Sequence, residues 1–288
     1  RLDATDRRVI TITGMAAGFT VLFGTPLGAA VFALEILHRR GLEYYEALMP
    51  AVIGSLSGYV VYLAITGIGL QPIWQLPGST ALHGVDLVWA GVCGVVGALV
   101  ATAFTYLTQV LRAGFRRLPS LSRPVLGGAA LALLAWLSPF ALTFGEQQIG
   151  YVTTTDLALR TLALAAVAKL VASSVTLTSG WKGGFIIPLF FIGTCLGRIG
   201  HHVLPHTNEA VLIAALMVAC NVGVTKTPLG SVLVVTGMAG LTLLPTTLIA
   251  AVVALLLTSN VNLIDSQRRR SEAVPVDGVS SPVLGGEP

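Results

Sequence analysis

Long stretches without a charged side chain constrain this sequence more than any other feature. These stretches cover residues 47–82, 87–111, 124–145 and 227–264. Each meets or exceeds the roughly 20 apolar residues that a helix needs to cross the hydrocarbon core of a bilayer. Hydrophobic residues make up 54% of the chain and charged residues only 10%, a composition that argues against an ordinary water-soluble protein. The sequence therefore predicts a multi-pass protein of the cell membrane, in contact with the lipid bilayer.

The apolar residues in these stretches are continuous, which favours helices over a membrane β-barrel with its alternating polar and apolar residues. Turn signals place helices at 6–23, 26–39, 46–67, 85–117, 124–143, 157–177, 185–202, 208–223, 228–242 and 245–263. Several of them would be only about 20 to 24 Å long, less than the thickness of the hydrocarbon core. We therefore predict an all-α polytopic membrane protein that includes half-helices packed inside the protein.

The distribution of charge predicts the orientation and the boundaries of this domain. The connections near 38–40 and 112–123 carry basic residues, whereas 68–84 contains no Lys or Arg, so the first two are expected on the cytoplasmic side. Residues 1–265 are expected to form a transmembrane domain. Residues 266–288 are expected to form a disordered cytoplasmic tail. The chain starts at Arg1 in a polar stretch, so we expect the natural N-terminus to lie upstream.

Two distant segments resemble each other. They read "GMAAGFTVLFGTPLGAAVFALE" from Gly14 and "LMVACNVGVTKTPLGSVLVVTG" from Leu216. Aligning the prolines of the two TPLG sequences gives an offset of 228 − 26 = 202 residues, and in both copies an apolar helix precedes a helix that starts with Pro. The alternative is a chance similarity between apolar segments. With this offset, the counterpart of Pro188 would precede residue 1.

The stretch "TSGWKGGFIIPLFFIG", residues 178–193, interrupts apolar sequence with a lysine and two glycines. Gly183 and Gly184 precede an apolar helix with Pro188 in its first turn. A helix N-terminus offers unpaired N–H groups and the positive end of the helix dipole, and can thus bind an anion without a cationic side chain. A glycine-rich packing hinge is the alternative interpretation.

These motifs resemble those of the CLC family of chloride channels and chloride/proton exchangers. "GFIIP", from Gly184, is similar to the GxFxP motif of that family, and the resemblance spans residues 5–263 in order and spacing. It implies an inverted-repeat fold with half-helices that meet at the membrane midplane. It also implies that residues 1–265 are an anion-transport domain, with selective chloride transport through a pore in each subunit of a homodimer. The anion would be held by the backbone amides of Phe185 and Ile186, with Gly183 and Gly184 giving the approach. The dimer contacts would lie on helices 26–39, 46–67, 228–242 and 245–263.

Several positions differ from the family pattern. The loops that carry the family's other anion-binding motifs and its gating glutamate belong to the first half and do not occur in this chain. The usual proton-relay glutamate falls on Ile36, while Glu35 matches a neighbouring structural glutamate. No tyrosine follows Tyr151, so the usual inner hydroxyl is absent from its expected place near 262–264. Phe185 stands where fluoride-selective members have a glutamate.

These differences favour passive or weakly proton-coupled movement of the anion. Proton-coupled antiport of chloride or another halide is the first alternative, and a non-conducting membrane scaffold or transporter fragment is the second. Glu35 is interpreted either as a proton-relay group or as a structural carboxylate paired with His38 or Arg39. Lys169, inside an apolar helix, is expected either to concentrate anions or to pair with Asp156 or Glu146.

No enzyme, cofactor, metal or nucleic-acid function is expected. Ser179 and the histidines at 201 and 202 lack the spacing of a serine-protease motif, and the sequence contains no HExxH motif. The cysteines, Cys93, Cys195 and Cys220, stand singly in apolar segments and are expected to be small core residues. No basic region with interleaved aromatic residues indicates binding to nucleic acid.

Overall fold

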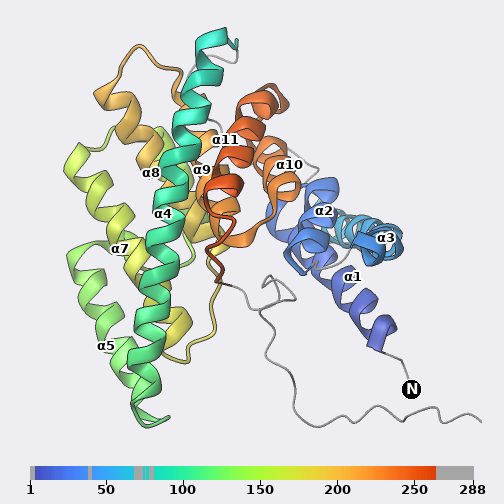
Figure 1. The fold of residues 1–288 in the computed structure, drawn as a ribbon, viewed down its shortest axis with the longest axis horizontal. Coiled ribbons are helices and arrows are strands. Elements are labelled where there is room, and N and C mark those ends of the chain that lie inside the picture. Colours follow the sequence, from blue (N-terminus) through green and yellow to red (C-terminus); the bar gives the residue numbers. More distant parts are fainter. Residues whose placement is uncertain (1–3, 38–40, 68–73, 75, 78–80, 264–288) are drawn as a thin grey trace, which may run out of the picture.

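The computed structural model describes residues 4–37, 41–67, 74, 76, 77 and 81–263, and these residues form helices and no strand. The elements in chain order are α1 (Ala4–Phe23), α2 (Pro26–Leu37), α3 (Gly41–Thr66), α4 (Gly84–Arg116), α5 (Ser122–Leu137), η1 (Pro139–Ala141), α6 (Glu146–Thr154), α7 (Leu159–Thr178), α8 (Ile186–Val203), α9 (Glu209–Thr225), α10 (Pro228–Ala239), η2 (Leu241–Leu243) and α11 (Leu244–Leu257) (Figure 1). The predicted disordered tail at 266–288 lies outside the described residues, as do His38 and Arg39.

Helix lengths agree with the mixture of spanning and short helices expected from the sequence. Helices long and apolar enough to cross a membrane cover Tyr45–Thr66, Gly84–Arg116, Leu159–Thr178 and Ile186–Val203. The charge-free run from 227 to 264 is instead divided between α10 and α11, with Gly240 at φ 128° after α10. Each of these helices is too short for the full hydrocarbon core, so they must pack as pieces inside the protein.

The segment between the expected helices 124–143 and 157–177 contains a helix that the sequence did not predict, because residues 146–154 form α6. Gly145, with φ 105°, turns the chain just before this helix. Ile149 and Val152, three residues apart, are fully buried and give α6 one apolar side. The glutamines before Ile149 and the threonines after Val152 hid this short amphipathic pattern. The expected helix 124–143 correspondingly ends earlier, at Leu137.

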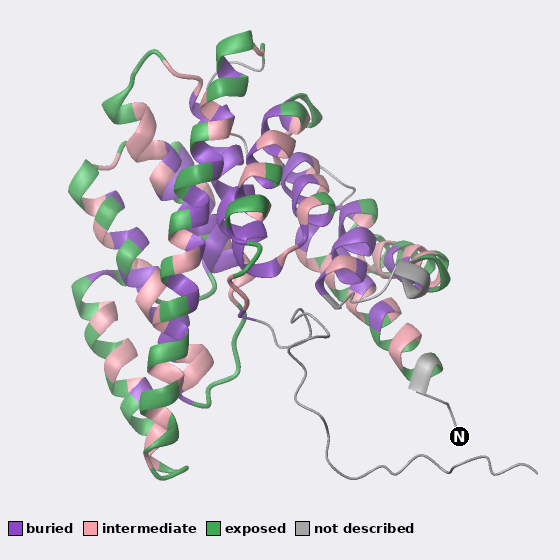
Figure 2. Cartoon of the chain, viewed as in Figure 1, coloured by how far each residue is buried: buried purple, intermediate pink, exposed green. Residues whose placement is uncertain are grey.

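Helices α8 and α9 pack closely at the centre of the molecule, where Figure 2 shows most of the buried residues. Gly193 and Gly197 of α8 are four residues apart. A Cβ atom on Gly193 would lie 2.5 Å from the Met217 nitrogen, and one on Gly197 would lie 2.5 Å from the Ile213 Cα. Small residues at this spacing let two helix backbones approach each other, as is common between membrane helices.

The internal repeat is visible in the backbone. Gly24 and Lys226, which the offset of 202 makes equivalent, both adopt positive φ values, 64° and 57°, just before the TPLG helices α2 and α10. The contacts between these two helices are also reciprocal. A Cβ on Gly28 would lie 2.9 Å from the Leu233 carbonyl carbon, and one on the equivalent Gly230 would lie 2.4 Å from the Phe32 Cα. The two copies therefore meet about a local two-fold relation at these glycines.

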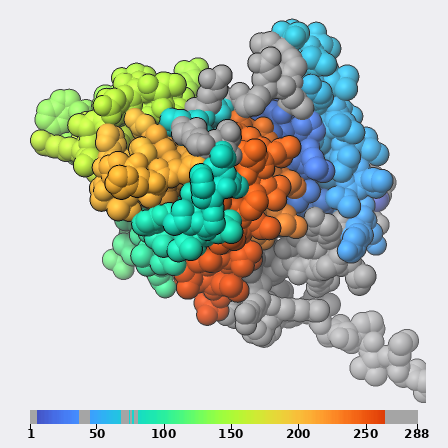
Figure 3. Space-filling model, turned by 90° about the horizontal axis from the view of Figure 1, so that it is seen from above, coloured from blue at the N-terminus to red at the C-terminus, as the bar shows by residue number. Residues whose placement is uncertain are grey.

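The crossing of α2 and α10 joins two groups of helices. Helices α1, α2 and α3 pack on one another, and α4 packs with α9 and α11 in the larger group. Seen from above, the orange and red segment of α10 and α11 lies between the teal α4 and the blue α1–α3 block (Figure 3). This arrangement brings parts of both repeat copies close to the start of α8.

Candidate functional site

Aromatic side chains from several helices fix the start of α8. Phe185 is the N-cap residue, and its ring lies 6.2 Å from that of Phe104 on α4. Within the first turns, Phe190 lies 6.3 Å from Phe23, and Phe191 stacks on Phe140 at 5.8 Å. These contacts hold the first turn of α8 by its side chains and leave the backbone ahead of it free to bind.

The backbone N–H groups at this helix start have no partner within the described part of the chain. The first hydrogen bond of the segment is donated by the Leu189 N–H to the Phe185 carbonyl, at 3.0 Å. The N–H groups from Gly183 to Ile187 donate none, and no side chain caps the helix. Gly183 and Gly184 are exposed, as an approach to the helix end requires. The predicted residues thus lie together and present several donors at the positive end of the helix dipole.

Helix α10 provides a contrast, because an anionic side chain occupies its N-terminus. The Glu35 carboxylate accepts hydrogen bonds from the Leu229 N–H at 3.2 Å and the Gly230 N–H at 2.7 Å. Glu35 therefore joins α2 to α10 through backbone groups. The neighbouring Ile36, which stands at the expected relay position, is buried among apolar residues. A carboxylate thus serves as the anion at α10, whereas the start of α8 has no such side chain.

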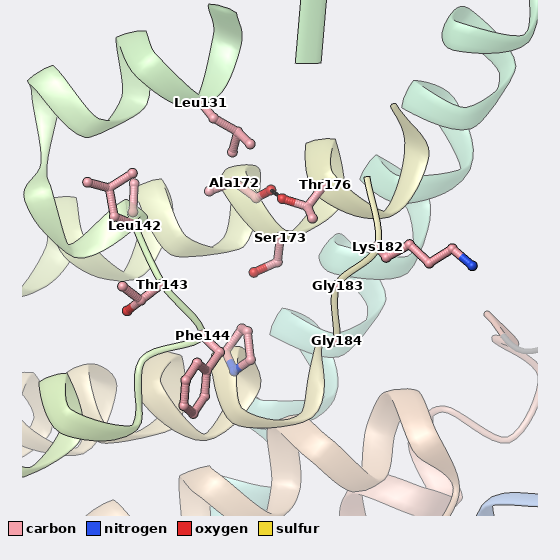
Figure 4. Close-up of a pocket in the computed structure, with 12 residues that line it drawn as sticks. Leu131, Leu142, Thr143, Phe144, Ala172, Ser173, Thr176, Lys182, Gly183 and Gly184 are labelled. Atoms are coloured by element: carbon pink, nitrogen blue, oxygen red, sulfur yellow. Dashed lines mark hydrogen bonds between the residues drawn. The ribbon is translucent and has the colours of Figure 1, made fainter. Parts of the chain in front are cut away.

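A pocket of about 300 Å³ adjoins the start of α8. The chain segments around it are α5, α7, the residues just before α6 and the residues just before α8 (Figure 4). Its lining residues are Leu131, Ala141, Leu142, Thr143, Phe144, Ala172, Ser173, Thr176, Lys182, Gly183, Gly184 and Pro188. None of these is acidic, so no lining side chain would repel an anion. The sequence patterns did not indicate the contribution of Leu131 on α5, because this residue is far from Gly183 along the chain.

Lys169 lies behind one wall of this pocket and is 1% exposed. Its ammonium donates to the carbonyls of Leu142 and Thr143, at 2.9 and 3.2 Å, and to the Gln148 side-chain oxygen at 2.8 Å. It also lies 4.9 Å from the centroid of the Phe191 ring. The expected pairing with Asp156 or Glu146 is wrong, since neutral acceptors hold the lysine and no carboxylate pairs with it in the described residues. Its ammonium is therefore held by neutral groups alone among the described residues.

The remaining polar candidates have structural surroundings. Arg198 donates to Glu209 and, at 3.1 Å, to the Thr155 carbonyl, which ties the end of α8 to α9 and α6. The three cysteines are buried and free, as expected of small core residues. No cluster of three or more metal-ligating side chains occurs among the residues that the structure describes.

The fold and this site define a polytopic helical membrane protein with an internal repeat and a helix terminus suited to an anion. Comparison with protein families matches residues 1–259 to the voltage gated chloride channel family. The chain belongs to this family, which confirms the resemblance seen in the sequence.

Two bacterial relatives illustrate the similarity. The chain is 32% identical over 274 residues to the chloride/fluoride channel protein of Pseudomonas syringae pv. tomato, covering 93% of this chain and 60% of the relative. It is 29% identical over 255 residues to the voltage-gated ClC-type chloride channel ClcB of Citrobacter koseri, covering 85% of this chain and 60% of the relative. This chain thus spans about three fifths of the length of these relatives.

Solved structures agree with this fold. A CLC-type fluoride/proton antiporter superposes with a TM-score of 0.78 at 25% identity, over 90% of this chain and 65% of that one. A slow cyanobacterial Cl⁻/H⁺ antiporter superposes with a TM-score of 0.73 at 20% identity, over 90% of this chain and 63% of that one. The all-helical CLC-type fold predicted from the sequence is therefore confirmed.

Proposed function

We propose that this protein carries small anions, chloride first, across the cell membrane. The observation that carries this proposal is the set of unpartnered backbone N–H groups from Gly183 to Ile187 at the start of α8. Amide dipoles bind an anion without a fixed opposite charge, and the anion can therefore leave again. Phe185 and Ile186 would hold the anion, and Gly183 and Gly184 would let it approach. The names of the relatives, chloride channels and halide antiporters, agree with this class of substrate.

We further propose that the movement is passive or only weakly coupled to protons. Ile36 has no titratable group, and the Glu35 carboxylate is engaged by the backbone of α10. A proton-relay role for Glu35 would require it to release these N–H groups in each cycle. This geometry favours the structural interpretation of Glu35 over the relay interpretation.

Chloride efflux from liposomes, recorded together with external pH, tests both proposals. We expect chloride release without proton movement, and empty liposomes serve as the control. Proton movement opposite to chloride would contradict passive transport and support a coupled antiporter. The absence of efflux would contradict anion transport and support a membrane scaffold. Replacing chloride by fluoride in the same assay compares the efflux of the two anions. We expect faster chloride efflux, since Phe185 stands in place of the glutamate of fluoride-selective members.

We also propose a homodimer with one pore in each subunit. Leu27 of α2 and Leu229 of α10, equivalent in the repeat, are 62% and 50% exposed. Helix α3 exposes further apolar side chains, among them Met49 and Ile53. We propose that the apolar side chains exposed on α2, α3, α10 and α11 form the dimer face, because the small residues of these helices permit close helix packing inside a bilayer.

A further inference from the structure

Ser173 is a buried hydroxyl without a partner. It lies on α7, is 6% exposed and lines the pocket beside α8. Its neighbours Ser174 and Thr176 donate to the backbone carbonyls of Leu170 and Ala172, four residues earlier in each case. The Ser173 hydroxyl has no hydrogen bond in the described part of the chain, and in Figure 4 its oxygen points into the pocket. Because this oxygen opens onto the pocket, the hydroxyl is available to donate to a ligand there.

The surroundings of this hydroxyl select for negative charge. Lys169 lies four residues before Ser173, on the same face of α7. Its ammonium engages the carbonyls of Leu142 and Thr143, two residues that line the pocket. The N–H groups of Gly183 and Gly184 are unpartnered, and both glycines line the opposite wall. The pocket therefore has donors and a nearby positive charge, with no acidic side chain in its lining.

The size and the walls of the pocket narrow the choice of anion. A volume of about 300 Å³ is many times that of one water, whose share of liquid volume is roughly 30 Å³, so an anion can enter with several waters. Leu131, Leu142, Phe144 and Pro188 make much of the wall apolar and offer no side-chain donor. Such a site cannot replace the whole hydration shell of a strongly hydrated anion. It suits weakly hydrated monovalent anions better than fluoride.

We propose that this pocket is a second anion subsite, in which the Ser173 hydroxyl donates to a partly hydrated halide next to the start of α8. The subsite rests on the proposed function, because it would supply anions to the amides of Phe185 and Ile186. It differs from that site in its chemistry, since it combines a side-chain hydroxyl with the amides of Gly183 and Gly184. Ser173 is then a specificity-determining residue for the transported anion.

Bromide serves as the probe, because its anomalous scattering locates it in crystals. We compare the unchanged protein with the Ser173→Ala and Thr176→Val variants. Thr176 lines the same pocket, but its hydroxyl is already bonded to the Ala172 carbonyl at 2.8 Å, which makes Thr176→Val the matched control. We expect one bromide peak at the amides of α8 and a second within hydrogen-bond distance of the Ser173 hydroxyl. Ser173→Ala removes the second peak and Thr176→Val keeps it.

Bromide titration by calorimetry, with the protein in lipid nanodiscs, gives the same comparison in a bilayer. We expect Ser173→Ala to weaken binding at the subsite roughly tenfold, the loss of one hydrogen bond to a charged group. A peak at α8 with none in the pocket overturns the subsite and leaves the proposed function standing. No peak at α8 contradicts the proposed function itself. A pocket peak that persists in Ser173→Ala overturns the role of Ser173.

Discussion

Single residues decide which helix N-termini of this protein carry a side-chain cap. Glu35 places a carboxylate on the N–H groups of Leu229 and Gly230, whereas α8 starts without any capping side chain. Two helix N-termini with similar intrinsic dipoles thus have different roles. The first is capped by a side chain of the protein itself, and the second has unpartnered N–H groups at which we propose that the anion binds.

Replacing Glu35 by Ala should lower the free energy of unfolding by about 1 to 3 kcal/mol, because the N–H groups of Leu229 and Gly230 lose their acceptor. Glu35→Gln keeps one acceptor oxygen and should cost less. Thermal unfolding in detergent, followed by tryptophan fluorescence, measures both. Glu46→Ala, at an exposed position on α3, is the control. A variant at Glu35 that kept full stability and changed only proton movement would instead support the relay interpretation.

At the scale of the elements, the crossing of α2 and α10 holds the two repeat copies together. Gly28 and Gly230 occupy equivalent places in the two TPLG sequences, and each lies against the backbone of the other copy. Close approach of this kind maximises van der Waals contact between the helices. In a bilayer this contact drives helix association, because lipid tails are as apolar as the side chains and no hydrophobic driving force acts between helices. The same crossing brings Glu35 within reach of α10.

Gly230→Ala should therefore destabilise the protein by roughly 1 to 3 kcal/mol or more, because the new Cβ would lie 2.4 Å from the Phe32 Cα and a backbone would have to move. Gly18→Ala on α1 is the matched control, since a Cβ there meets nothing within 4 Å. It should be neutral or slightly stabilising through higher helix propensity. Equal melting temperatures for the two variants in detergent would argue against a tight crossing.

At the scale of the whole molecule, exposed apolar surface is extensive, as a membrane protein requires. Lipid can cover any exposed apolar surface, so exposure alone does not identify a dimer face. The face on α2, α3, α10 and α11 is distinguished by carrying equivalent residues of both repeat copies, Leu27 and Leu229. A two-fold dimer across it would place the start of each α8 in its own subunit.

Cross-linking in membranes tests this dimer. Leu229→Cys should form a cross-linked dimer with a short bismaleimide, because residue 229 lies on the proposed face. Val125→Cys on α5 is the control, since it is 70% exposed on a different helix. The native cysteines are buried and should react little. Cross-linking at 125 and not at 229, or a monomer by native mass spectrometry, would contradict the proposed face.

The sequence by itself determined the membrane class, most of the helices, the internal repeat and the helix start at the GGFIIP stretch. These features are local, because charge-free length, Gly and Pro act on the backbone where they stand. The helix at 146–154 was missed because its two buried apolar residues form too short a pattern among polar ones.

Only the tertiary structure decided which groups meet at the site. Glu35 caps a helix that starts nearly two hundred residues later, Lys169 finds neutral acceptors in place of carboxylates, and Ser173 faces a pocket. Each of these depends on packing between segments distant in the chain. Hydropathy and spacing report whether a residue is in the membrane, but the partner of a buried polar group is fixed by the neighbouring helices.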